Sequence, residues 1–496
     1  MIFNSMSFLI FFPIVTVVYF LIPHKIKWIW LLVTSYFFYM CWNPQYAILI
    51  GFSTVITYLS GIFIEKLRKI PDIKKSKRLM HLVVYLCLAI NLGLLFFFKY
   101  FDFAIDNINI ALSLLNLSLV QPEFDVLLPV GISFYTFQAL SYTIDVYRGD
   151  IYAERNIGKY ALFVSFFPQL VAGPIERSKN LLTQINDKHN FDYTRAKLGL
   201  QLMLWGLFQK IVIADRVAII VNNVYGNYSN QSGIVLILAT ILFAVQIYCD
   251  FSGYSNMAIG AAQVMGFKLM DNFNRPYFAR SIKDFWHRWH ISLSSWFRDY
   301  LYIPLGGSRC SKERKCFNLM VTFLLSGLWH GASWNYVVWG VLHGFYQVSG
   351  EILTPVRSKI KKAFKVNESS FAHRLFQCVF TFILVDIAWI FFRAPGVKAG
   401  LSIVKTMITN LNLNALIDGT LYTFGVSQSQ FTTMLITIVV LFIVSSLQRK
   451  YKLREKLQQQ PLWFRWMIYF IAINSILYLG VYGSEYAQTQ FIYFQF

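Results

Sequence analysis

The stretch that decides the fold class covers residues 317–349 and reads FNLMVTFLLSGLWHGASWNYVVWGVLHGFYQVS. It contains no Asp, Glu, Lys or Arg, and its apolar residues form runs instead of alternating with polar ones. A helix needs about 20 such residues to cross the roughly 30 Å hydrocarbon core of a bilayer. Only helices and closed barrels satisfy their backbone polar groups there, and a barrel strand would alternate in polarity. The stretch therefore predicts membrane-embedded helix, as one span or as a pair.

The same apolar character extends over the whole chain. Of 496 residues, 56% are hydrophobic and only 14% are charged, whereas a soluble domain carries about 25% charged residues. The other runs that are long enough to cross, alone or as pairs, are 8–22, 28–42, 46–64, 80–98, 196–214, 232–249, 376–393, 431–447 and 464–482. We predict an all-α polytopic membrane protein with about ten to twelve spans or half-spans, folded as a single membrane domain over residues 1–496.

The positive charges predict the orientation of the chain in the membrane. The first run, Phe8–Ile22, has no basic residue before it and no small-residue cleavage pattern after it, so it is predicted to be a retained span. Basic residues cluster between the runs, at 66–78, 268–315, 357–365 and 449–456. The positive-inside rule places these clusters in the cytoplasm and the N-terminus outside. The net charge of +21 is then explained by topology in a cell membrane, and nucleic acid is not expected as a partner.

Three segments are too polar for lipid and too aromatic for ordinary loops: 127–150, 166–178 and 249–302. They mix Trp, Tyr and Phe with Arg, His and Asp, and Pro129 and Gly131 open the first of them. Irregular or polar backbone is tolerated at membrane depth only where protein buries it. We therefore predict that these segments are buried, re-entrant or interfacial helices, with 268–315 leading into the catalytic region.

His330 is the strongest candidate for chemistry. It lies fifteen residues beyond Lys315, which at about 1.5 Å per helical residue is roughly 22 Å from the basic side and near the bilayer centre. An ionisable group at that depth is costly and normally marks a functional path. Gly331, Ala332 and Ser333 would allow close approach of a substrate or helix, and Trp329 and Trp334 were expected to flank the site as apolar walls. A buried neutral imidazole is suited to act as general base; a hydrogen-bonded core histidine is the alternative.

The remaining histidines of the polar segments are more ambiguous. His290 is flanked by tryptophans, and by Arg288, Arg298 and Asp299, so a second catalytic group and a structural histidine stay equally open. Its spacing of three from His287 predicts one shared helix face, but no acidic residue completes a metal site, and no metal is expected. His343 is predicted to be a core or rim residue.

Buried acids and cysteines are predicted to be structural. Asp250, Asp386 and Glu176 are expected to pair with arginines or with the histidines. The six cysteines form no close pair of the metal-ligand type, and buried free thiols are expected. No Walker loop, GxSxG elbow or GxGxxG motif is present, so an enzyme function has to rest on the histidines.

Two long strings resemble the signature of the membrane-bound O-acyltransferase family: DFWHRWHISLSSWFRDYLYIPLGG (284–307) and SGLWHGASWNYVVWGVLHG (326–344). The resemblance spans essentially the whole chain, and it continues in the segments SYFFYMCWNPQY (35–46), LPVGISFYTFQALSYTIDVYRG (128–149), FFPQLVAGPIER (166–177), GLFQKIVIADR (206–216), YCDFSGYSNMAIG (248–260) and FIYFQF (491–496). The PLGG after RDYLYI and the chain length resemble the bacterial alginate O-acetylation branch more than the teichoic acid D-alanyl branch.

The resemblance implies a ring of helices around a thinned centre with a tunnel joining the two membrane faces. It implies that His330 is the family histidine and that His290 is the second histidine of the bacterial members; His287, where Arg or Asn is expected, receives no role. It also implies a cytoplasmic acyl donor, acetyl-CoA, with no permanently bound cofactor, and an extracytoplasmic SGNH-type acetyltransferase partner that passes the acetyl group to a polysaccharide.

Three alternatives remain at this stage. The first is a D-alanyl transferase that takes its acyl group from a carrier protein. The second is a polysaccharide or lipid-linked sugar permease, although no internal repeat of the transporter kind is present. The third is a scaffold that only recruits an extracytoplasmic enzyme. The polymer, the final acceptor, the oligomeric state and the roles of His287, Asp250 and Asp386 are not determined by the sequence.

Overall fold

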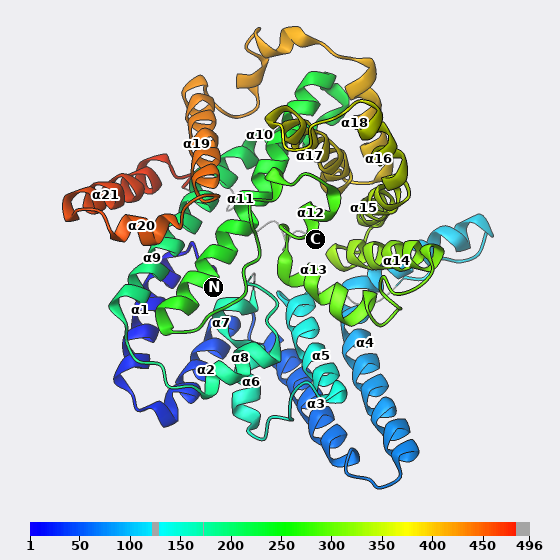
Figure 1. The fold of residues 1–496 in the computed structure, drawn as a ribbon, viewed down its shortest axis with the longest axis vertical. Helices are drawn as coiled ribbons and strands as arrows, with labels where there is room; N and C mark the ends of the chain where they lie inside the picture. Colours follow the sequence, from blue (N-terminus) through cyan, green and yellow to red (C-terminus); the bar gives the residue numbers. More distant parts are fainter. Residues whose placement is uncertain (122–127, 172, 483–496) are drawn as a thin grey trace. The chain divides into compact units, whose positions relative to one another are not determined.

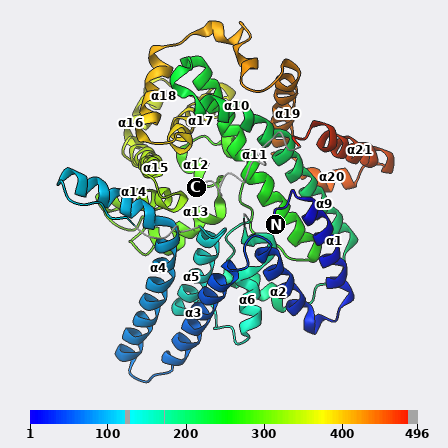
Figure 2. The same ribbon diagram turned by 180° about the vertical axis from the view of Figure 1, so that it is seen from behind.

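A computed structural model describes residues 1–121, 128–171 and 173–482, and within these ranges the chain is helical with no strand (Figures 1 and 2). The chain divides into two compact units. The first unit comprises Met1–Leu202 and Met257–Met270, and the second comprises Met203–Asn256 and Asp271–Phe496. Each unit is described by itself below, and the single domain expected over 1–496 stays a prediction. The terminal string 491–496 lies outside the described residues.

The first unit is built from apolar helices with short connections. Its helices are α1 (Met6–Leu21), α2 (His24–Met40), α3 (Tyr46–Leu67), α4 (Ile73–Leu114), α5 (Ile132–Arg148), α6 (Ile157–Ser165), α7 (Phe167–Leu170), α8 (Ser178–Asn186) and the start of α9 (Tyr193–Leu207). Asp72 begins α4 by accepting hydrogen bonds from the backbone N–H groups of Lys74 and Lys75. Helices α3, α4 and α5 pack against one another (Figure 1).

Helix α5 lies inside the first unit and confirms the prediction of a buried polar-aromatic segment. Gly131 precedes it with φ of 78°, a left-handed conformation that glycine adopts without the steric cost of a side chain. Nearly every residue of α5 is buried, including Asp145, whose carboxylate accepts a hydrogen bond from the Ser178 hydroxyl at 3.0 Å. The polar groups of this helix are therefore satisfied by protein, as an embedded segment requires.

The second unit contains the remaining helices. They are the π-helix η1 (Phe208–Ala214), α10 (Asp215–Gly226), α11 (Gly233–Met265, whose end belongs to the first unit), α12 (Ile282–Trp286), α13 (Ile291–Phe297), the π-helix η4 (Arg298–Tyr302), α14 (Lys312–His330), α15 (Trp334–Ile352), α16 (Thr354–Ala363), α17 (Phe371–Arg393), α18 (Val397–Thr409), α19 (Gln428–Leu447), α20 (Leu453–Gln458) and α21 (Leu462–Leu479). Short 3-10 turns lie at η2 (Tyr228–Asn230), η3 (Pro276–Phe278), η5 (Leu413–Leu416) and η6 (Thr420–Thr423).

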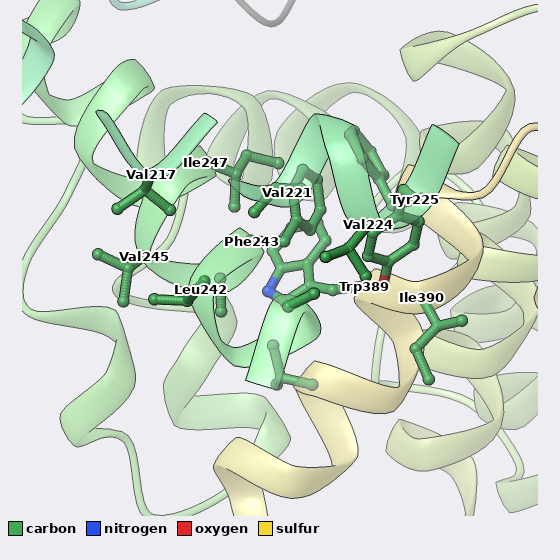
Figure 3. Packing of buried hydrophobic residues seen from close by; sticks show 14 of the residues in the cluster. Val217, Val221, Val224, Tyr225, Leu242, Phe243, Val245, Ile247, Trp389 and Ile390 are labelled. Carbon is green, nitrogen blue, oxygen red and sulfur yellow. The ribbon is translucent and has the colours of Figure 1, made fainter. Parts of the chain in front are cut away.

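The core of the second unit forms where α10, α11 and α17 meet. Trp389 of α17 is fully buried, and Phe243 of α11 packs edge-on against it with ring centroids 6.3 Å apart. Val221 and Val224 of α10 lie beside this pair (Figure 3). Within a lipid bilayer the hydrophobic effect does not drive helices together, so their association depends on close van der Waals packing. The interlocking aromatic and β-branched side chains of this core provide such packing. The core thus fixes the helices that surround the candidate site.

Among the residues that the structure describes, six helices are long and apolar enough to cross a membrane: α3, α4, α11, α17, α19 and α21. This confirms an all-α polytopic membrane protein. Helices also cover the other predicted runs, with α1 and α2 over the first two and α14 and α15 over the stretch 317–349. Many apolar side chains on α1, α4 and α19 are exposed, as lipid-facing helices require.

A buried ion cluster joins three elements of the second unit. Lys210 in η1 is 1% exposed, and its Nζ lies 2.8 Å from a carboxylate oxygen of Asp215 and 2.8 Å from one of Asp250. A buried charge persists only when it is paired. The expected partner of Asp250 was an arginine or a histidine, so that expectation was wrong: the partner is a lysine that comes forty residues earlier in the chain.

Candidate active site

The candidate site is organised by a helical hairpin of α14 and α15 in the second unit (Figure 1). Helix α14 is continuous from Lys312 to His330, and Ser311 caps its start by accepting a hydrogen bond from the N–H of Arg314. It stops at His330 because Gly331 takes an extended conformation, with φ −166° and ψ 153°. The chain then reverses into α15. Residues 317–349 therefore form a pair of helices, and His330 is the last residue of the first.

Two glycines set the spacing of the hairpin. A Cβ on Gly327 would lie 2.3 Å from the carbonyl oxygen of Tyr336, and one on Gly340 would lie 2.4 Å from that of Phe323. No side chain fits at such distances, so the backbones of α14 and α15 cross in direct contact. Gly331 likewise packs under the ring of Tyr336, at 2.2 Å for a built Cβ. The small residues around His330 thus admit a neighbouring helix, one of the two roles expected for them.

His330 is enclosed by aromatic rings. It is 3% exposed, and its ring centroid lies 4.9 Å from that of Trp339, 5.1 Å from Trp329 and 5.4 Å from Phe392, each in an edge-to-face arrangement. Trp329 is the apolar wall that the sequence predicted. Trp334 is not, because 55% of its surface is exposed. Trp339 and Phe392, which take that place, lie on α15 and α17.

His290 reaches His330 from a different segment of the chain. The two ring centroids are 6.4 Å apart, and Trp329 contacts both histidines. His290 is completely buried, and the ring of Phe251 on α11 meets it edge-on at 4.7 Å. It lies outside the six spanning helices, and burial lowers its pKa to about 3, because the surroundings disfavour the charged imidazolium. The structure therefore brings together the two histidines that the sequence selected.

The backbone of His290 is strained. It takes φ 43° and ψ 54° immediately before α13, in the left-handed region that residues other than glycine rarely occupy. Such strain costs on the order of 1–3 kcal/mol and persists only when the surroundings enforce it. The carbonyl of His290 accepts the first hydrogen bond of α13, from Ser294, which fixes the ring at the start of that helix.

Asn272 supplies this enforcement, and sequence reasoning missed it. Its backbone carbonyl accepts a hydrogen bond from the N–H of Ile291, and its side-chain oxygen accepts one from the Ser292 hydroxyl at 2.6 Å. Its amide nitrogen donates to Ser255 of α11 at 2.8 Å. Asn272 therefore ties the residues that follow His290 to α11. Its only signal in the sequence was a polar residue in an otherwise aromatic segment.

His287 lies on the surface, and the nearby arginines pair with nearby acids. His287 is exposed and follows the end of α12, so the predicted face shared with His290 was wrong: a single helix does not contain both residues. Arg288 pairs with Asp284 at 2.8 Å, and Arg298 pairs with Asp299 at 2.7 Å. The contacts of His290 described above are aromatic.

His343 is a core histidine, as predicted. It is fully buried in the middle of α15, and its Nδ1 accepts a hydrogen bond from the indole N–H of Trp286 at 3.3 Å. Its ring stacks on Phe285 with an interplanar angle of 6°. These contacts join α12 to α15, and they hold the segment that leads to His290.

Two further polar residues of this unit, Asn335 and Asp386, differ in their hydrogen bonding. Asn335, at the start of α15, donates hydrogen bonds to the carbonyls of Phe391 and Ala394 at 3.2 and 3.1 Å, so it fastens the hairpin tip to the end of α17; sequence reasoning missed it. Asp386 on α17 is half-buried, and within the described part of the chain its Oδ1 has no hydrogen-bond partner. The pairing expected for Asp386 stays a prediction.

In the first unit, Glu176 is fully buried and accepts hydrogen bonds from the Met270 N–H and the Asn180 amide. Burial raises its pKa to about 7, because a carboxylate is poorly solvated there. The six cysteines are free thiols, of which Cys87 and Cys249 are buried. Over residues 1–121, 128–171 and 173–482, no cluster of three or more His, Cys, Asp or Glu side chains could hold a metal ion.

The arrangement is suited to proton transfer in an enclosed space. A neutral imidazole accepts or donates a proton near neutral pH, and walls of Trp and Phe exclude water, which strengthens each electrostatic contact within. The two histidines come from separate segments, and the helix end, the left-handed residue and Asn272 fix their positions. These features are typical of a catalytic centre and rarer in a packing cluster.

Comparisons with known proteins gave one family match and several similar chains. Residues 153–386 match MBOAT, the membrane-bound O-acyltransferase family, and that range includes both histidines. The chain is 38% identical to the probable alginate O-acetylase AlgI of Pseudomonas syringae, over 86% of this chain and 76% of that protein. It is 32% identical to the peptidoglycan O-acetyltransferase of Helicobacter pylori over 94% and 91% of the two chains. A teichoic acid D-alanyltransferase of Streptococcus thermophilus is 28% identical over 47% of this chain.

Proposed function

Because this chain belongs to the membrane-bound O-acyltransferase family, we propose that His330 and His290 form its catalytic centre and that the group it transfers is acetyl. The observation that carries the proposal is the approach of the two rings to 6.4 Å inside a buried aromatic enclosure. The sequence likeness to proteins named as O-acetylases, which is stronger than the likeness to the D-alanyltransferase, supports acetyl as the acyl group.

His330 acts as the general base in this mechanism. One ring nitrogen takes the proton of an acceptor hydroxyl while the hydroxyl oxygen attacks the carbonyl carbon of a thioester. The tetrahedral intermediate collapses with cleavage of the C–S bond, and the His330 imidazolium returns its proton to the departing thiolate. The products are an O-acetyl ester and a free thiol, so atoms and charge balance without a cofactor.

His290 is proposed to bind the polar groups of the intermediate. Its neutral ring has one N–H donor, and a donor aimed at a developing oxyanion in a dry site is worth about 10²- to 10³-fold in rate. The hydrogen bonds of Asn272 tie the segment that follows His290 to α11, which supports a fixed position for its backbone. Preorganisation of this kind is what makes such a donor effective.

Acetyl-CoA is the proposed donor, and an extracytoplasmic polysaccharide is the proposed final acceptor. The basic region 268–315 suits the phosphates of coenzyme A, and the positive-inside rule supports placing that region in the cytoplasm of a cell membrane with the N-terminus outside. An SGNH-type acetyltransferase partner outside the membrane would receive the acetyl group on a serine hydroxyl and pass it to the polymer.

The test is acyl transfer by the purified, full-length protein in lipid nanodiscs. Acetyl-CoA labelled in the acetyl group is supplied with a soluble hydroxyl acceptor, and labelled ester and free thiol are both measured. Wild-type protein is expected to release thiol and form ester, and H330A is expected to do neither while remaining monodisperse. Equal turnover by H330A would refute the assignment.

A second acyl donor distinguishes the proposed acetyltransferase from the main alternative, a D-alanyl transferase. A D-alanyl carrier protein offered in place of acetyl-CoA tests the carrier-dependent reading, and transfer from the carrier alone would replace the proposed donor. The absence of transfer from either donor, with folded protein, would favour the permease or the scaffold.

A further inference from the structure

A second polar site lies in the first unit, at the junction of α1 and α2. It is a pocket of about 230 Å³, lined by residues of α1, α2, α6 and α8 and by Phe267. Three lysines, Lys25, Lys27 and Lys159, line it together with His24, against one acidic residue, Asp187. A concave site with this surplus of positive charge is suited to bind an anion.

Lys27 is held in the wall of this pocket. It is 9% exposed, and its Nζ donates a hydrogen bond to the carbonyl of His189 at 2.8 Å. The same Nζ lies 4.7 Å from the ring centroid of Tyr19 and 5.3 Å from that of Phe20. These contacts fix the position of the charge on α2. A buried cation kept this way is a built feature of the pocket and not a mobile surface lysine.

The other walls combine a flat aromatic surface with an apolar base. Trp28 packs directly on Gly158, where a Cβ would lie 2.3 Å from the indole ring. The apolar residues of the lining are Leu31, Leu162, Ile185 and Phe267. Lys25 is exposed on α2, and Lys159 is half-buried on α6. The pocket therefore offers positive charge beside an apolar surface, as the binding of an amphiphile requires.

Apolar stripes on two helices lead to the pocket. The exposed side chains of α1 include Leu9, Ile10, Ile14, Val17 and Leu21. Those of α2 include Ile26, Ile29, Val33 and Phe37. Leu21 and Ile26 end the stripes on either side of His24 and Lys25, which line the pocket. In a membrane protein, exposed apolar stripes of this kind contact acyl chains.

We infer that the pocket binds the phosphate headgroup of an anionic phospholipid whose acyl chains lie along the exposed stripes of α1 and α2. A soluble phosphate would use the lysines alone, whereas a phospholipid also uses the stripes that end beside them. Tyr19 and Trp28 line the pocket, and tyrosine and tryptophan are enriched at the headgroup level of a bilayer. Each lysine near an anionic lipid surface strengthens such binding by about fivefold.

The experiment measures lipid retention by the full-length protein. Detergent-purified protein is mixed with dioleoylphosphatidylglycerol or dioleoylphosphatidylcholine, and bound lipid is counted by native mass spectrometry over a titration. The K25Q/K159Q variant removes two charges that are exposed or half-buried, so it is expected to fold. The matched control is K74Q/K77Q, which removes two exposed lysines at the start of α4, outside the pocket.

The expected result is a phosphatidylglycerol affinity roughly 10- to 30-fold weaker in K25Q/K159Q, unchanged in K74Q/K77Q, and little binding of phosphatidylcholine at this site. Equal loss in both variants would mean that only general surface charge matters, and would overturn the proposal. So would displacement of the lipid by inorganic phosphate or free coenzyme A at equal concentration, because the ligand would then be a soluble phosphate. If K25Q/K159Q is poorly folded, K25Q alone, at an exposed position, must still weaken binding.

Discussion

Two histidines of one hairpin, His330 and His343, are alike in burial and in their contact with one tryptophan, and they differ in where they lie on their helices. Both are buried, and the ring of each lies 4.9 Å from that of Trp339. His343 occupies the middle of α15 and accepts a hydrogen bond from Trp286 at Nδ1, which ties it to α12. His330 ends α14 where the helix breaks, and a second histidine approaches it. Burial among aromatic rings is therefore common to both histidines, and the backbone break and the titratable neighbour are what distinguish His330.

The largest expected effect is at His330. Replacing it with alanine in H330A removes the proposed general base, and we expect acetyl transfer to fall by about 10²- to 10⁴-fold. Initial rates with labelled acetyl-CoA measure this, with size-exclusion chromatography as the folding control. If H343A instead lost activity to this extent while H330A kept it, His343 would be the catalytic residue and His330 the packing residue.

His290 is expected to rank second. H290A should lower kcat by about 10²- to 10³-fold with a smaller effect on KM, because the lost contact matters in the tetrahedral intermediate. Alanine keeps the Cβ that disfavours left-handed backbone, whereas Asn tolerates that conformation and retains a donor, so H290N serves as the matched control. A rise in KM alone, with kcat intact, would make His290 a binding residue.

The Trp286–His343 contact should affect stability more than chemistry. H343A leaves the buried indole N–H of Trp286 without its acceptor, which costs about 1–3 kcal/mol of folding free energy. The double variant W286F/H343F removes donor and acceptor together and should recover most of this loss. Thermal unfolding in nanodiscs measures the difference in stability between H343A and W286F/H343F. A double variant no more stable than H343A would show that the hydrogen bond is not the source of the stability.

His287 should have the smallest effect. It is exposed beyond the end of α12, and surface substitutions of this kind change stability by about 0.5 kcal/mol or less. We expect H287A to retain wild-type transfer rates and wild-type thermal unfolding. Strong loss of transfer in H287A, with intact folding, would place the centre nearer the surface than proposed.

Much of the fold followed from the sequence because apolar runs are a local property. Each predicted run is helical in the described chain, and α5 is buried as its mixture of aromatic and polar residues indicated. The pair of helices in 317–349 was one of two possibilities, and the choice depended on Gly331, where the backbone becomes extended; a glycine weakens a helix without always ending it.

The site was predictable only in part. His330 stood out because the cost of burying an ionisable group can be read from one run, whereas His290 was selected over a structural role only through family resemblance. The strained backbone of His290, the hydrogen bonds of Asn272 and the pairing of Asp250 with Lys210 join segments far apart in sequence. Such contacts depend on the tertiary arrangement, and no local pattern encodes them.

The glycine crossing of the hairpin also constrains how such a gene can change in length. Gly327 and Gly340 meet, and the twelve residues between them include His330 and the reversal of the chain. An inserted codon between Gly327 and His330 would turn the histidine by about 100° and move it by about 1.5 Å along the axis. An insertion before Lys312 would leave that geometry intact. Insertions and deletions should therefore accumulate outside this interval and be eliminated within it.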